Sequence, residues 1–187
     1  MASGAMCGGS IPLWCTNKSC ASQIGIESVT YSSFILFERI IIMRYLIHCC
    51  QKKIHPHHLS AIREYAKRLS AFCATELLLS ETLSLPDNIS TGKHSFFLVL
   101  PGSSNFSSEE LADQIQQLQM NGMTNVHFLI GFTETQLYEA YPSISEYLTP
   151  VRLCISRFSL SADTCAVMLF EQLYRSYTIL QGKTYHK

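Results

Sequence analysis

Residues 167–176 read Val-Met-Leu-Phe-Glu-Gln-Leu-Tyr-Arg-Ser, and residues 181–187 read Gln-Gly-Lys-Thr-Tyr-His-Lys. The first stretch belongs to an apolar pattern that predicts a long helix over residues 162–180. Gly182 follows this pattern, and glycine is the residue that most often ends a helix in the left-handed conformation. The chain therefore closes with a long helix and a short tail that carries an aromatic ring, an imidazole and two ammonium groups.

Strand-like and helix-like patterns alternate upstream of this helix. Apolar runs predict strands at 44–50, 76–80, 96–100, 126–130 and 151–155. Pro56 stands where a helix can begin, and apolar residues follow it at spacings of three or four as far as Phe72. Ser107 and Glu110 form a capping-box pattern that predicts another helix, ending near residues 121–122. Such alternation predicts an α/β fold in which helices cover both faces of a parallel sheet.

A ligand is expected at the ends of these strands, because parallel sheets bind ligands beyond the carboxyl ends of their strands. Gly102, Gly131 and the segment after Ile155 stand at those ends. Glycine lets the main chain approach a ligand closely. For each glycine taken singly, a tight turn with a positive φ is an equally good interpretation.

The pairing of the last helix with the tail resembles the signature of the RlmH-type family of SPOUT methyltransferases. In that signature a helix with Glu-Gln-x-Tyr-Arg-Ala precedes a terminal Tyr-His-basic tail, and Glu171–Ser176 and Tyr185–Lys187 stand in those places. The strands that end at Gly102 and Gly131 are similar to the family's strands, and the first helix shares its Glu-Tyr-x-x-Arg. The resemblance covers residues 43–187.

The resemblance implies a parallel sheet flanked by helices, with a C-terminal trefoil knot that cradles the cofactor. Knots are rare, so this expectation rests on the family alone. The implied activity is transfer of a methyl group from S-adenosyl-L-methionine to a ring nitrogen of a pseudouridine in large-subunit rRNA, on the assembled ribosome. The implied assembly is a homodimer formed through the C-terminal helix, in the cytoplasm and without membrane contact.

The resemblance also implies the roles of particular residues. His186 would help to remove the proton of the acceptor nitrogen, Tyr185 would orient the base, and Arg175 and Lys187 would meet phosphate. For Tyr174, packing at the dimer interface is favoured over catalysis. The cofactor pocket would be formed by Leu98, Gly131, Ile155, Ser156, Arg157, Phe158, Ser159 and Leu160.

Three positions depart from the family. Phe132 replaces the second glycine after the strand and is expected to crowd the cofactor, while Ser161-Ala162 and Ala166 replace a Pro-His pair and an arginine. The missing histidine would have handled a proton, and the missing arginine would have donated hydrogen bonds to an RNA phosphate. Two alternatives to an enzyme follow: a degenerate, non-catalytic member that binds RNA or ribosomes, and an interaction protein that dimerises through residues 162–180.

Charge is balanced in total, with 14 basic and 14 acidic residues, yet it is unevenly distributed. Every charged residue in 43–68 is basic except Glu64. The charged residues of 69–146 are mainly acidic, and those of 147–187 are mainly basic. A fold that brings the two basic segments together would have a basic face suited to an acidic partner. A solvated surface with chance clustering explains the pattern equally well.

The eight cysteines form no Cys-x-x-Cys pair, so they predict free thiols in a reducing compartment and no disulfide framework. His55, His57 and His58 with Cys49 and Cys50 match no standard metal-site spacing, and no metal is predicted.

Residues 1–42 read as an N-terminal extension, poorly structured or non-native, in front of a methyltransferase-like domain at 43–187. They carry few charges, show no sustained helical or strand period, and lack the ordered zones of a secretory signal. The most apolar stretch, 34–50, contains Glu38, Arg39 and Arg44, so no transmembrane helix is predicted.

Overall fold

A computed structural model describes residues 43–85, 93–102, 106–142 and 149–183. Its centre is a sheet of five parallel strands in the order β2-β1-β4-β3-β5. The strands are β1 (Arg44–Cys49), β2 (Ala74–Leu79), β3 (His94–Val99), β4 (Asn125–Ile130) and β5 (Val151–Leu153). The predicted N-terminal extension lies outside the described residues.

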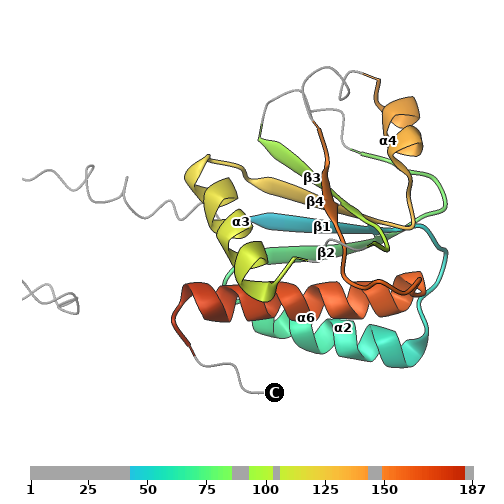
Figure 1. The fold of residues 1–187 in the computed structure, drawn as a ribbon. Coiled ribbons are helices and arrows are strands. Elements are labelled where there is room, and N and C mark those ends of the chain that lie inside the picture. The colour runs from blue at the N-terminus through green and yellow to red at the C-terminus, as the bar shows by residue number, and fades with distance from the viewer. Residues whose placement is uncertain (1–42, 86–92, 103–105, 143–148, 184–187) are drawn as a thin grey trace, which may run out of the picture. The chain divides into compact units, whose positions relative to one another are not determined.

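Helices cover both faces of this sheet (Figure 1). The helices α2 (Pro56–Leu69), α3 (Ser108–Met120) and α6 (Ala162–Leu180) pack on one face, and α4 (Glu134–Ala140) packs on the other. Each pair of consecutive parallel strands needs a crossover, and the helices supply most of these connections. The predicted α/β fold is confirmed in this form.

The alternation of side chains along each strand produces two separate cores. Tyr45, Phe97 and Phe128 belong to the larger core, under α2, α3 and α6. Leu98 and Leu129 belong to the smaller core, under α4. Because both faces are buried, the central strands read as continuous apolar runs in the sequence.

The predicted elements agree closely with the observed ones, with one omission. The last helix has the predicted bounds, and the strands shift by one or two residues. The capping box of α3 is present: Glu110 N donates to Ser107 Oγ at 3.0 Å, and Ser107 N donates to Glu110 Oε2 at 2.7 Å. Helix α4 was not predicted, although its own capping box at Thr133 and Gln136 was available in the sequence.

In the described part of the chain, no helix has both the length and the apolar character that crossing a bilayer requires. In the same residues, no three His, Cys, Asp or Glu side chains are grouped so as to hold a metal ion.

Three buried histidines form a row across β1, β4 and β3 on the face that carries α4. His127 lies in the middle, with its Nδ1 3.1 Å from His48 Nε2 and its Nε2 2.9 Å from His94 Nδ1. Its ring also stacks on Phe96, with 4.6 Å between the ring centroids. A neutral imidazole has one donor and one acceptor, so both hydrogen bonds form when all three rings carry their proton on the same type of nitrogen.

Burial keeps this row neutral. Burial lowers the pKa of His48 to about 4, and the negative charge of Glu76 offsets only part of this effect. Burial also lowers the pKa of His127, with the neighbouring His48 and His94 acting in the same direction. Folding therefore excludes protons that the unfolded histidines would bind below their ordinary pKa of 6.5.

We expect the free energy of unfolding to fall as the pH decreases from about 6.5 toward 4, because only the unfolded histidines gain protons in this range. Each histidine held neutral should contribute about 2 kcal/mol to this loss, so His48 and His127 together should account for a loss of about 4 kcal/mol between pH 7.5 and pH 5, measured by urea denaturation. His127→Phe should weaken this pH dependence, whereas the exposed His57→Asn should leave it unchanged. Equal slopes for His127→Phe and the unsubstituted protein would contradict the assignment.

Candidate functional site

A cavity of about 320 Å³ opens at the carboxyl edge of the sheet, where the sequence placed a ligand. Three segments enclose it: the end of β3, the end of β4, and the chain from the end of β5 into the first turn of α6. The lining residues are Val99, Leu100, Pro101, Ile130, Gly131, Phe132, Thr133, Ile155, Ser156, Phe158, Ser159, Leu160, Ala162 and Cys165.

Gly131 brings main chain to the cavity wall. Its φ is +78°, and a Cβ at this position would lie 3.1 Å from Cys50 Cβ. The Cys50 main chain is itself held, because its N–H donates to Ile130 O at 2.9 Å. A side chain at position 131 would therefore be strained and would also crowd the turn that follows β1.

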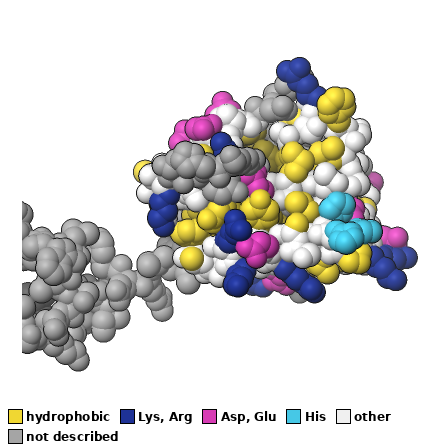
Figure 2. Space-filling view, turned by 90° about the horizontal axis from the view of Figure 1, so that it is seen from below, with side chains coloured by type: hydrophobic (Ala, Val, Ile, Leu, Met, Phe, Trp, Pro, Cys, Tyr) yellow, Lys and Arg dark blue, Asp and Glu magenta, His cyan; other side chains and the backbone are white. Residues whose placement is uncertain are grey.

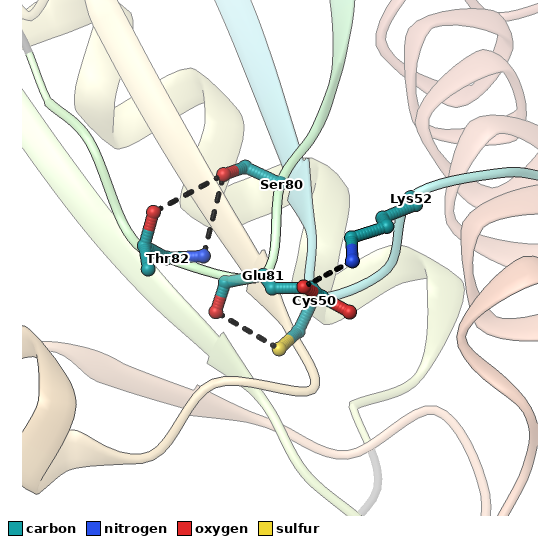
Figure 3. A network of polar contacts seen from close by, with 5 residues as sticks. All are labelled: Cys50, Lys52, Ser80, Glu81 and Thr82. Carbon is teal, nitrogen blue, oxygen red and sulfur yellow. Dashed lines mark hydrogen bonds and ion pairs between the residues drawn. The ribbon is translucent and has the colours of Figure 1, made fainter.

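Polar contacts hold the turns after β1 and β2 together (Figure 3). Lys52 Nζ lies 2.9 Å from Glu81 Oε2, and the Cys50 thiol donates to Glu81 O at 3.7 Å. The hydroxyls of Ser80 and Thr82 lie 3.4 Å apart in the same turn. The ion pair is exposed and weak by itself, so the turn depends on the contacts acting together.

The segment after β5 is held by main-chain contacts. Gly102 N donates to Ser156 O at 3.3 Å, and the Cys154 thiol contacts Gly102 O and Ser156 O at 3.0 and 3.2 Å. Phe158 N donates to Ser156 Oγ at 3.0 Å. These contacts fix the backbone of this cavity wall through one main-chain hydrogen bond and through the side chains of Cys154 and Ser156.

Phe132 does not fill the cavity. Its side chain is only 2% exposed and belongs to the core under α4, with Leu129 and Leu137. The crowding expected of this residue is therefore not seen, because the ring is accommodated in the second core of the sheet.

The residues predicted to bind the cofactor lie in and around this cavity. Gly131, Ile155, Ser156, Phe158, Ser159 and Leu160 line it. Arg157 is exposed in the same segment without lining the cavity, and Leu98 is fully buried in the core under α4. Their roles remain predictions.

Of the predicted catalytic and RNA-binding residues, Arg175 alone lies in the part of the chain that the structure describes. Tyr185, His186 and Lys187 lie outside the described residues. Arg175 is partly buried on α6, and Tyr174 packs within the chain, its ring centroid 6.3 Å from that of Tyr65.

Sequence reasoning did not identify several lining residues, among them Leu100, Thr133, Ala162 and Cys165. The signal available for the first two was their position at the end of predicted strands, since Leu100 is the last residue of one and Thr133 follows another. Ala162 and Cys165 enter through the first turn of α6, which only the packing of that helix brings to the sheet edge. Burial raises the pKa of the Cys165 thiol, so this wall stays neutral at pH 7.

Beside the cavity, the starts of α2 and α6 are joined through Asp163. Its Oδ2 accepts from His55 N at 3.1 Å and lies 3.4 Å from His58 Nδ1. The His55 N–H is the main cause that lowers the pKa of Asp163. This contact brings a group of imidazoles to the edge of the sheet that holds the cavity.

The two basic segments of the sequence meet on the face that α2 and α6 form. Lys53, Arg63 and Lys67 are exposed on or just before α2, and Lys183 is exposed just after α6. Figure 2 shows Lys and Arg side chains over this face and histidines gathered on one side of it. Acidic and apolar side chains lie among them, so the face is basic in patches.

Comparison with known proteins assigns this part of the chain to a family. The family described as "Predicted SPOUT methyltransferase" matches residues 43–186. The chain belongs to the SPOUT methyltransferase family. This membership confirms the predicted class of enzyme, which takes its methyl group from S-adenosylmethionine.

Relatives of known name match between 68% and 78% of the chain. Ribosomal RNA large subunit methyltransferase H 1 of Thermoanaerobacter sp. (strain X514) is 32% identical over 145 residues, 78% of this chain and 100% of the relative. Ribosomal RNA large subunit methyltransferase H of Clostridium botulinum (strain Alaska E43 / Type E3) is 32% identical over 147 residues, and that of Clostridium kluyveri (strain ATCC 8527) is 28% identical over 150. Each of these two matches covers 68% of this chain and 89% of the relative.

The cavity suits the methyl donor of SPOUT enzymes. Its volume lies at the lower end of the range for small-molecule sites, about 300–1,000 Å³. The lining residues include no Asp, Glu, Lys or Arg, so apolar side chains and main-chain groups would hold the adenine and the ribose. The main-chain approach at Gly131 provides the close wall that such recognition needs.

We expect Gly131→Ala to weaken S-adenosylmethionine binding at least about tenfold, or about 1.4 kcal/mol, measured by calorimetry. The substitution should also lower the free energy of unfolding by more than the roughly 1–2 kcal/mol that a left-handed φ costs a residue with a Cβ. The matched control is Gly122→Ala, which has the same strain at φ +72° and nothing within 4 Å of the new Cβ. If both variants lose the same stability and keep the same affinity, the contact with Cys50 is unimportant.

Proposed function

We propose that this protein is an S-adenosylmethionine-dependent rRNA methyltransferase that modifies a ring nitrogen of a pseudouridine in the large ribosomal subunit. The observation that carries the proposal is the cavity at the carboxyl edge of the sheet, walled by Gly131 and by the segment after β5. The names of the relatives support rRNA of the large subunit as the substrate.

In this proposal the cofactor supplies an activated methyl group, and the chain supplies position and proton transfer. The main chain at Gly131 and at Ile155–Leu160 holds the cofactor, while Tyr185 orients the acceptor base. His186 accepts the proton of the acceptor nitrogen, a role in which an imidazole is effective near pH 7. Arg175 and Lys187 meet phosphate groups of the RNA. Holding the reacting atoms in line at near-attack distance provides much of the rate acceleration.

The same proposal includes the architecture of the family. The C-terminal part of the domain threads a trefoil knot around the cofactor, and two copies associate through α6 in the cytoplasm. Residues 43–187 form the methyltransferase domain, and residues 1–42 are an extension. Membership in the SPOUT family supports each of these points.

A second candidate is a degenerate member that binds ribosomes without transferring methyl groups. Ala162 and Ala166 favour this candidate, because the resemblance implies that the family has a histidine and an arginine at these two places. Ala162 lines the cavity and Ala166 is fully buried in the main core, so neither offers a polar group. This candidate keeps the cavity and loses part of the chemistry.

We expect the protein to transfer radiolabelled methyl groups from S-adenosylmethionine to the large-subunit rRNA of assembled ribosomes from a Clostridium strain that lacks its own enzyme of this family. The product should be a methylated pseudouridine, identified by mass spectrometry of the digested rRNA. His186→Gln should lower kcat by about 10²- to 10⁴-fold, because a positioned general base contributes that much. Its affinity for S-adenosylmethionine should stay unchanged, since the imidazole acts on the acceptor.

The two candidates differ in the outcome. Saturable cofactor binding and ribosome binding without methyl incorporation would favour the degenerate member. A protein that gives no binding heat with S-adenosylmethionine at any concentration would refute both the methyltransferase and its cofactor site.

A further inference from the structure

Phe158 is an exposed aromatic side chain at the mouth of the cavity. It is 79% exposed, and in the described ranges the other large exposed apolar residues are Leu79 and Met120, neither of them aromatic. Phe158 borders the cavity, yet most of its surface stays open to solvent. A ring exposed to this extent loses the favourable free energy that burial of a phenylalanine provides.

The backbone that carries this ring is firmly held. Ser156 Oγ accepts from Phe158 N at 3.0 Å, and Ser156 O accepts from Gly102 N and from the Cys154 thiol. The turn at 156–158 is thus tied to the end of β3. A platform fixed in advance binds a partner with less loss of conformational freedom than a mobile one.

The surroundings of the ring favour an anionic chain. Arg157 is exposed next to it, and the cavity lining contains no carboxylate. Ala162 of the same cavity precedes Asp163, which holds His55 and His58 at the start of α2. An RNA strand that passes the cavity mouth would therefore meet a guanidinium beside the ring and imidazoles near the same edge.

We propose that Phe158 is the platform on which an unpaired RNA base stacks when the acceptor strand enters the site, with Arg157 contacting the adjoining phosphate. The inference rests on the proposed rRNA methyltransferase function and names the RNA side of its site. Unpaired bases present a flat face that stacks on aromatic rings, and such stacking is the usual means by which proteins hold single-stranded RNA. Phe158 lines the cavity, and most of its surface is open to solvent, so the ring is available to the nucleic acid.

Phe158→Ala, Phe158→Leu and Phe158→Trp test this assignment. Loss of one stacked base should weaken RNA binding about tenfold. We expect the Kd and KM for assembled ribosomes to rise by that factor in the Ala and Leu variants and to stay near the starting value in the Trp variant. The Kd for S-adenosylmethionine, measured for all three variants, separates a contact with RNA from a contact with the cofactor, because Phe158 also lines the cavity. Met120→Ala is the matched control, since Met120 is 80% exposed at the end of α3 and should alter neither constant.

Three results would overturn the assignment: a loss of S-adenosylmethionine affinity with unchanged RNA binding, full activity of Phe158→Leu, or dissociation of a dimer in Phe158→Ala by light scattering. The first makes the ring a cofactor wall, the second an apolar contact, and the third a subunit contact. If the unsubstituted protein fails to bind assembled ribosomes, the proposed function fails as well. If it binds them and Phe158→Ala binds equally, only the stacking platform is refuted.

Discussion

Parallel pairing in register of β1, β4, β3 and β5 is the constraint on which the site depends. Ile130 pairs with both Cys49 and Val99, and Val99 pairs with Leu153, so four strands end side by side. The chain must leave the sheet at one edge after each of them. The turns at Gly131 and Gly102 and the segment after Leu153 consequently meet, and the cavity forms among them.

Burial on both faces gives the strands two different cores. One face carries the large apolar core under α2, α3 and α6, and the other combines an apolar cluster under α4 with the histidine row. Phe132 belongs to this second face, which explains how a large ring replaces a glycine without filling the cavity. Burial keeps these imidazoles neutral, and the two hydrogen bonds between the rings give both ring nitrogens of His127 a partner away from water.

A wall built from main chain tolerates change in side chains. The hydrogen bond from Gly102 N to Ser156 O and the contacts of the Cys154 thiol with both carbonyl groups involve neither Ala162 nor Ala166. Cofactor binding and proton transfer can therefore diverge separately in such a protein. The exposed ring of Phe158 adds a third element, because it stands on the same wall and is available to the substrate.

Local pattern was sufficient to predict the strands, α2, α3 and α6, since each buries a periodic apolar face that the sequence displays directly. It was also sufficient for the family, through Glu171–Ser176 and Tyr185–Lys187. Helix α4 was missed because only one apolar residue, Leu137, is fully buried in its seven residues, too few for a visible period. Packing between distant segments decides that Phe158 is exposed and that Phe132 is buried. It also brings Ala162 and Cys165 to the cavity. Such contacts leave no periodic mark along the chain, and only the tertiary structure decided them.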